Sequence, residues 1–111
     1  MIEDKIKEIR EHLTDTDDIA VLTDWDMVCS AEFAFIATEL AKVKRDRATR
    51  ELALKSEILA SQGKYTEKEI ERQYFASEEG KYYQYGSEML KALAKLISAV
   101  RFKRKMLTDK F

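Results

Sequence analysis

Proline is absent from this chain of 111 residues, and glycine occurs only at Gly63, Gly80 and Gly86. Proline breaks a helix interior and glycine weakens one, so a chain almost free of both favours long uninterrupted helices. At average usage a chain of this length would hold about five or six prolines. The sequence therefore predicts an all-α fold.

The N-terminal segment has the pattern of a short amphipathic helix over residues 2–13. Charged residues alternate there with apolar ones at three-to-four-residue spacing, which is typical of one buried helix face. The apolar positions are Ile2, Ile6, Ile9 and Leu13. We expect residues 1–23 to form this short acidic helix and a linker.

A long helix is expected to follow the linker. Residues 14–23 are rich in Thr and Asp, whose side chains compete for backbone hydrogen bonds. Thr23, followed three residues later by Asp26, resembles a capping box and marks a helix start. Residues 24–62 contain no helix breaker, and Gly63 is well placed as the C-terminal cap.

The rest of the chain predicts a connection and a second long helix. Residues 63–80 form the connection, in which Thr66 and Glu69 suggest a capping box at the start of a short helix over residues 66–76. The last helix is expected over residues 81–108. Two long helices joined this way fold back as an antiparallel hairpin, so we expect the whole chain to be a single helical domain.

The hairpin is expected to be oligomeric. Charged residues make up 37 % of the chain, against roughly 25 % in a typical domain. A thin hairpin with so much polar surface commonly completes its burial by self-association. The expected oligomer interface consists of apolar positions at heptad-like spacing on both long helices: Phe33, Ile36, Leu40, Val43, Leu90, Leu93, Ile97 and Val100.

Charge is segregated along the chain, although the formal net charge is only −1. Residues 1–32 hold ten acidic and three basic side chains, whereas two later segments are strongly basic. If the chain reverses near residue 71, position 45 lies beside position 97 and position 40 beside position 102, and the basic segments meet. The basic residues of these two segments are Lys42, Lys44, Arg45, Arg47 and Arg50 in the first, and Lys91, Lys95, Arg101, Lys103, Arg104, Lys105 and Lys110 in the second.

Three interpretations of these basic segments stay open. Clustered Lys and Arg bind phosphate backbones with strong salt dependence. The same residues can instead pair with the acidic N-terminal segment or with another subunit, or they can form a solvated face. Aromatic residues near the connection, Tyr74 and Phe75 among them, can stack on unpaired bases or pack on each other.

The sequence holds little that points to catalysis, so we expect no enzyme, no cofactor and no metal site. His12 is the only histidine, and the single cysteine, Cys29, is expected in the core, as is Trp25. Asp15 could begin a calcium-binding loop only if position 20 were a glycine, and that position is Ala20. No glycine-rich phosphate loop is present.

The sequence also bears on localisation. No apolar run approaches the roughly 20 residues of a membrane span, and the N-terminus lacks a signal-peptide pattern. We therefore expect a cytoplasmic protein with no membrane partner.

The layout resembles that of small helical-hairpin proteins of bacteriophages, in particular the UvsY-type recombination mediator family. The resemblance rests on a short N-terminal helix, a long basic helix, a tyrosine-containing connection and a basic final helix from Val100 to Phe111. It implies a ring-like oligomer that binds single-stranded DNA and helps load a recombinase onto strands coated by single-strand-binding protein. The candidate nucleic-acid-binding residues that the resemblance implies are Lys42, Lys44, Arg45, Arg47, Arg101, Lys103, Arg104 and Lys105. The chain departs from the family in being shorter and in its acidic N-terminal third.

The leading expectation is thus an oligomeric accessory protein that binds single-stranded DNA or RNA, with a recombinase or a single-strand-binding protein as a possible partner. The alternative is a protein–protein adaptor or inhibitor that acts through its acidic N-terminal segment. A third reading is a purely structural assembly element.

Overall fold

Residues 2–109 are described in a computed structural model, and within this range the chain forms four α-helices and no strand. The helices are α1 (Ile2–His12), α2 (Ile19–Gln62), α3 (Glu67–Ala76) and α4 (Glu78–Asp109). The expected all-α class is confirmed. None of these helices is long and apolar enough to cross a membrane.

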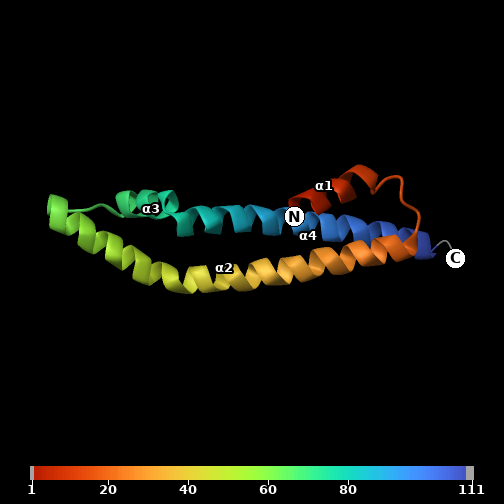
Figure 1. Cartoon of the computed structure of the whole chain (residues 1–111), viewed down its shortest axis with the longest axis horizontal. Helices are drawn as coiled ribbons and strands as arrows, with labels where there is room; N and C mark the ends of the chain where they lie inside the picture. Colours follow the sequence, from red (N-terminus) through yellow and green to blue (C-terminus); the bar gives the residue numbers. More distant parts are fainter. Residues whose placement is uncertain (1, 110–111) are drawn as a thin grey trace. The chain divides into compact units, whose positions relative to one another are not determined.

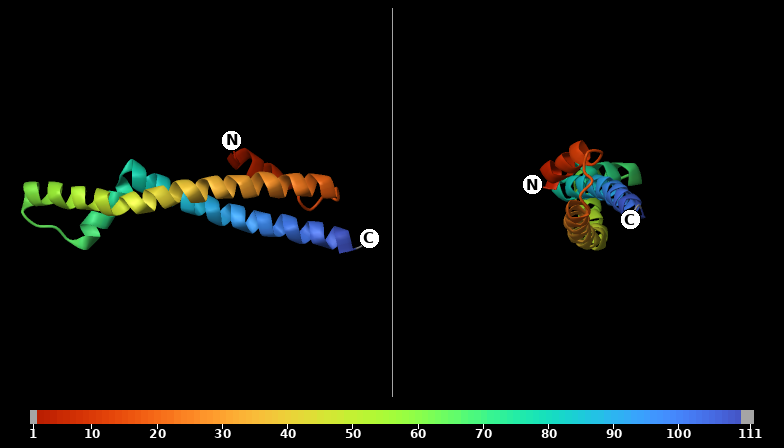
Figure 2. Two further views of the ribbon diagram at one scale, coloured as in Figure 1. Left: turned by 90° about the horizontal axis from the view of Figure 1, so that it is seen from below. Right: turned by 90° about the vertical axis from the view of Figure 1, so that its right-hand side faces the viewer.

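The chain packs as two compact units. The first comprises Met1–Ile36 and Met89–Phe111, and the second comprises Ala37–Glu88. In each unit, a segment of α2 runs antiparallel to a segment of α4 (Figures 1 and 2). The expected helical hairpin is therefore confirmed, and each unit is described below by itself.

The core of the first unit is built from three helices, with α1 lying along the paired α2 and α4 (Figure 1). Its buried apolar side chains come from α1 (Ile6, Ile9), α2 (Leu22, Trp25, Cys29, Ile36) and α4 (Met89, Leu93, Leu96, Val100). The expected core positions of Trp25 and Cys29 are confirmed. Full burial of an aliphatic side chain such as Leu93 contributes roughly 1.5–3 kcal/mol.

The long helix α2 begins at Ile19, five residues before the expected start. The cap is Asp18, whose carboxylate accepts a hydrogen bond from the Ala20 amide at 2.9 Å. Thr23 lies inside the helix, where its hydroxyl donates to the Ile19 carbonyl at 2.9 Å. The apparent capping box of Thr23 and Asp26 was therefore the wrong start signal.

The second unit shows that the chain reverses at Gly63. This residue has a φ of 77°, the left-handed conformation that glycine adopts without steric cost, and it ends α2 as expected. Thr66 then caps α3, accepting a hydrogen bond from the Glu69 amide, which confirms the predicted start of that helix. The segment that runs back along α2 already includes Glu67, which forms an ion pair with Lys55 of α2 at 3.6 Å.

The expected register of the hairpin is wrong because the reversal lies at Gly63 and not near residue 71. In the second unit, Leu40 lies against Gly86, where an added Cβ would approach Leu40 Cδ2 to 2.7 Å. In the first unit, Arg101 contacts Asp26. Position 40 is therefore not beside position 102. Because α3 belongs to the segment that runs back along α2, each residue of α4 lies beside a different α2 residue from the one expected.

The last helix begins at Glu78, three residues before the expected start. Ser77 caps it, because its hydroxyl oxygen accepts a hydrogen bond from the Gly80 amide at 3.1 Å. Glu78 and Glu79 occupy its first turn, where negative charge complements the helix dipole.

The apolar seam expected to join copies packs largely inside the chain. Ile36, Leu40, Leu93 and Val100 are each at most 7 % exposed in the single chain. The other four members, Phe33, Val43, Leu90 and Ile97, are half-buried. The four buried residues belong to the chain's own core, and the oligomer interface expected from these eight positions stays a prediction.

Candidate functional site

Two of the arginines expected to bind nucleic acid are turned toward a buried carboxylate in the first unit. Asp26 is only 7 % exposed. Arg101 Nε lies 3.1 and 3.0 Å from its two carboxylate oxygens, and Arg104 Nη2 lies 3.0 Å from Oδ2. Ser30 donates a further hydrogen bond to Asp26 at 2.9 Å. This network holds the C-terminal part of α4 to the start of α2.

The pKa values reflect this network. Burial raises the pKa of Asp26. The hydrogen bonds from Arg101 and Ser30 and the charges of both arginines outweigh this effect, so the pKa of Asp26 lies below its ordinary value. The hydrogen bond and the charge of Asp26 raise the pKa of Arg101. Asp26 is therefore an ionised structural partner of two cations.

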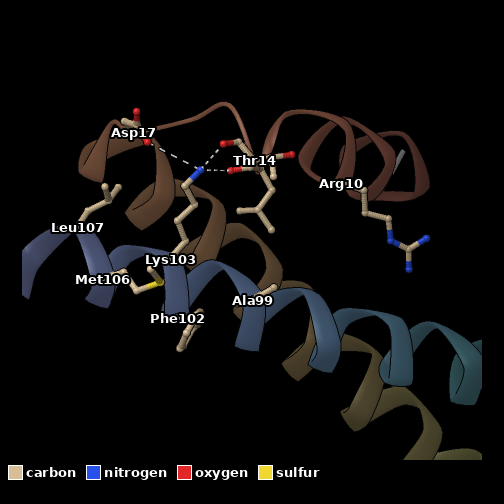
Figure 3. A pocket seen from close by; sticks show the side chains of 9 residues that line it. Arg10, Thr14, Asp17, Ala99, Phe102, Lys103, Met106 and Leu107 are labelled. Atoms are coloured by element: carbon tan, nitrogen blue, oxygen red, sulfur yellow. Dashed lines mark hydrogen bonds and ion pairs between the residues drawn. The ribbon is translucent and has the colours of Figure 1, made fainter.

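Lys103 is engaged as well, at the C-terminal end of α1. Its Nζ donates to the carbonyl oxygens of Leu13 at 2.6 Å and Thr14 at 2.7 Å, and it lies 3.9 Å from Asp17 Oδ1. Figure 3 shows the ammonium group reaching these three groups. A cation at this place satisfies carbonyls that have no partner within the helix and complements the negative end of its dipole.

Arg47 on α2 contacts two aromatic rings and a carboxylate within the second unit. Its guanidinium carbon lies 4.8 Å from the ring centre of Tyr74 and 5.1 Å from that of Phe75, and Nε donates to Glu51 at 2.6 Å. The hydrogen bond to Glu51 raises the pKa of Arg47. The two rings themselves pack edge to face. Of the two roles left open for this aromatic pair, mutual packing is what these contacts show.

The three remaining nucleic-acid-binding candidates on α2 do not share one face. Lys42, Lys44 and Arg45 are exposed. At about 100° per residue, Lys42 and Lys44 point about 160° apart, whereas Lys42 and Arg45 are only about 60° apart. Lys42 has a weak exposed pair with Glu39 at 3.6 Å. Lys44 and Arg45 have no ion pair within residues 2–109, and neither does Lys105 on α4.

The eight candidate cations are thus divided between the two units, and most are engaged within the chain. Lys42, Lys44, Arg45 and Arg47 belong to the second unit, and Arg101, Lys103, Arg104 and Lys105 belong to the first. Across its whole sequence, the first unit holds eleven acidic and ten basic residues, and the second holds ten of each. Near-neutral units with internal pairs favour the intramolecular interpretation of the charge segregation.

Three acidic side chains of α1 are exposed on its outer side. Asp4, Glu8 and Glu11 follow one another at the spacing of a single helix face, and only Glu8 has an ion pair among the described residues, to Lys5 at 3.4 Å. This face is available to a basic partner, as the adaptor interpretation requires.

An apolar groove lies between α1 and the C-terminal part of α4. It has a volume of about 470 Å³, and the residues that line it are Arg10, Leu13, Thr14, Asp17, Ala99, Phe102, Lys103, Met106 and Leu107. Phe102 is 65 % exposed and Met106 is 50 % exposed at its edge. Figure 3 shows that Phe102 points away from α1, on the side of α4 opposite to Lys103. Large apolar side chains gathered around a hollow are typical of an interaction site.

Sequence reasoning missed this surface because it considered only one apolar stripe on the last helix. Ala99, Phe102 and Met106 form a second stripe with the same three-to-four-residue spacing, on the side of α4 opposite to the buried Leu93 and Val100. The second apolar stripe on the last helix was the feature of the sequence from which this surface could have been predicted.

The His, Cys, Asp and Glu side chains of the described residues do not gather into a metal site. Within residues 2–109, no group of three or more His, Cys, Asp or Glu side chains could hold a metal ion. Burial raises the pKa of the Cys29 thiol, which keeps it in the unreactive protonated form. His12 is exposed at the end of α1.

Comparisons of the chain with models of protein families, with curated proteins and with solved structures found no match. The resemblance to the UvsY-type family therefore stays a prediction.

Proposed function

We propose that this chain is a non-enzymatic protein-binding module and that its binding surface is the groove between α1 and α4 with the exposed Phe102 and Met106 at its edge. The observation that carries the proposal is the contrast on α4. Arg101, Lys103 and Arg104 are directed to Asp26 or to the carbonyl oxygens that follow α1, whereas Phe102 and Met106 beside them face solvent. Such a surface gains free energy by burying apolar area against another polypeptide.

The shape and chemistry of the surface favour a helical partner. The groove follows a helix, its floor is apolar, and its rim carries charges of both signs at Arg10 and Asp17. A partner helix with an apolar stripe and flanking charged residues fits such a groove, with Phe102 as the anchor. Lys103, which lines the groove, is already bound to carbonyl oxygens and is therefore engaged within the chain.

Site-specific photo-crosslinking tests the proposal. A benzophenone amino acid replaces Met106 in the groove and, as the matched control, Glu57, which is exposed on α2 in the other unit. After irradiation of nuclease-treated extract of the producing cells, we expect a crosslinked polypeptide from position 106 and none from position 57. Adding Phe102→Asp should abolish the crosslink. Equal labelling at both positions, or none at position 106, would remove the proposal.

Single-stranded nucleic-acid binding is the second candidate, supported by Lys42 and Arg45. Both are exposed on neighbouring sides of α2, and a phosphate could displace the weak Lys42–Glu39 pair. We expect fluorescence anisotropy with a labelled single strand at low salt to show binding that salt weakens and that Arg45→Glu reduces. Absence of binding at micromolar protein, or binding that salt does not weaken, would rule out this second candidate, and protein binding would remain as the proposed function.

A further inference from the structure

The outer face of α4 carries a stripe that is exposed along its whole length. The α4 stripe consists of Lys95, Ala99, Phe102, Met106 and Asp109, and all five residues are exposed. Their spacing of four, three, four and three residues is that of the a and d positions of a coiled coil. The stripe covers about four turns, or about 21 Å of helix. Its middle is apolar, and its two ends carry opposite charges.

We infer that the partner helix at this surface is the α4 stripe of a second copy of this chain, packed antiparallel about a two-fold axis near Phe102. The inference rests on the proposed function, because it names the occupant of that same surface. A two-fold interface must be complementary to itself, so that a residue at one end of the stripe meets the residue at the other end of the partner's stripe.

Charge complementarity favours this occupant. Lys95 and Asp109 are seven residues before and after Phe102, so the two-fold axis sets Lys95 of each copy near Asp109 of the other. Neither residue has an ion pair within residues 2–109 of the single chain. Two opposite-charge pairs form at once, one on each side of the axis. A parallel arrangement would instead set like charges together at both ends.

Shape supports the same arrangement. Ala99 is small and lies one turn from the large Phe102, and the groove beside it is lined by Leu13 and Leu107. With the axis at Phe102, the two phenyl rings lie next to each other at the centre of the contact, and the space left by Ala99 of each copy can receive Met106 of the other. An aromatic anchor in a hollow at the centre of the contact is where binding energy concentrates.

The contact is short, which sets its strength. Two helices in contact over only about 21 Å bury on the order of 800 Å² of accessible surface in total, below the roughly 1,200 Å² of a standard stable interface. We therefore expect a reversible dimer with a dissociation constant of about 10–100 μM, and not a permanent assembly.

Analytical ultracentrifugation of the full chain, from about 1 μM to 500 μM to span that range, tests the inference. Wild type should pass reversibly from monomer to dimer. Lys95→Asp should weaken the dimer about tenfold, because two carboxylates then face each other on each side of the axis. Lys95→Asp combined with Asp109→Lys should restore it to within about threefold, since the charges are exchanged and still complementary. Lys81→Asp, the same charge change on the second unit's part of α4, should have no effect.

The outcomes separate this inference from the function on which it rests. A chain that stays monomeric throughout, or a double variant as weak as Lys95→Asp, rules out the antiparallel α4 dimer. If the chain is monomeric and position 106 crosslinks a polypeptide of different mass, the second copy is wrong and the protein-binding function stands. If position 106 crosslinks nothing and no dimer forms, both fall.

Discussion

The closest backbone approach to a glycine occurs at Gly80, in the first turn of α4. A Cβ at this position would lie 2.0 Å from the carbonyl oxygen of Tyr74 and 2.6 Å from the Cα of Phe75. Both are backbone atoms of α3, so neither can rotate away. Gly86 on the same helix is different, because its Cβ would meet only the flexible side chain of Leu40, at 2.7 Å from Cδ2.

The two glycines should therefore respond oppositely to alanine. In an ordinary helix interior, alanine is favoured over glycine by roughly 0.5–1 kcal/mol. At Gly80 the added methyl group must displace backbone, and overpacking of this kind costs about 3 kcal/mol, the upper end of the usual range. We expect Gly80→Ala to lower the free energy of unfolding by about 2 kcal/mol. For Gly86→Ala, a rotamer change of Leu40 offsets the helix gain, and the net change should stay within about 1 kcal/mol.

Urea unfolding followed by far-ultraviolet circular dichroism measures the difference. The slope of the transition should be unchanged while its midpoint falls for Gly80→Ala, and the melting temperature should drop by roughly 10 °C. Gly86→Ala is the matched control, since it makes the same chemical change on the same helix. Gly80→Ala as stable as wild type, or more stable, would refute the close contact between α4 and the end of α3.

Three further predictions concern Asp26, Arg47 and Lys103, the charged residues with contacts inside each unit. The pKa of Asp26 lies below its unfolded value of 3.8, so its contribution to stability is present above that pH and is lost as the pH falls through the lower folded value. Asp26→Asn should therefore reduce the loss of unfolding free energy below about pH 4. A loss as steep as that of wild type would contradict this prediction. Arg47→Ala should cost about 1–2 kcal/mol by removing the contacts to Tyr74 and Phe75, with Arg47→Lys intermediate in thermal melts; equal effects of the two variants would show that charge alone matters. Lys103→Met should speed amide hydrogen exchange in α1 while leaving α3 unchanged, and unaltered exchange in α1 would argue against its role as a cap.

Local signals in the sequence were enough to predict most of the helices. The lack of proline predicted the long helices, Gly63 marked the end of α2, and Thr66 marked the start of α3. These signals act over at most four residues, so a single sequence contains them in full. The start of α2 failed because both Asp18 and Thr23 are good capping residues and only the fold selects between them.

The sequence by itself determined that the chain is helical, that it bends back once, and that its charges are segregated into acidic and basic segments. These properties follow from composition and from patterns repeated every few residues. Only the tertiary structure decided what the charges do, because Asp26 and Arg101 are 75 residues apart in the chain and the register that joins them depends on where the reversal falls. A shift of that reversal from residue 71 to Gly63 changes every partner across the hairpin. Arg101, Lys103 and Arg104 are thereby engaged within the chain, whereas Phe102 and Met106 on the outer face of α4 stay exposed.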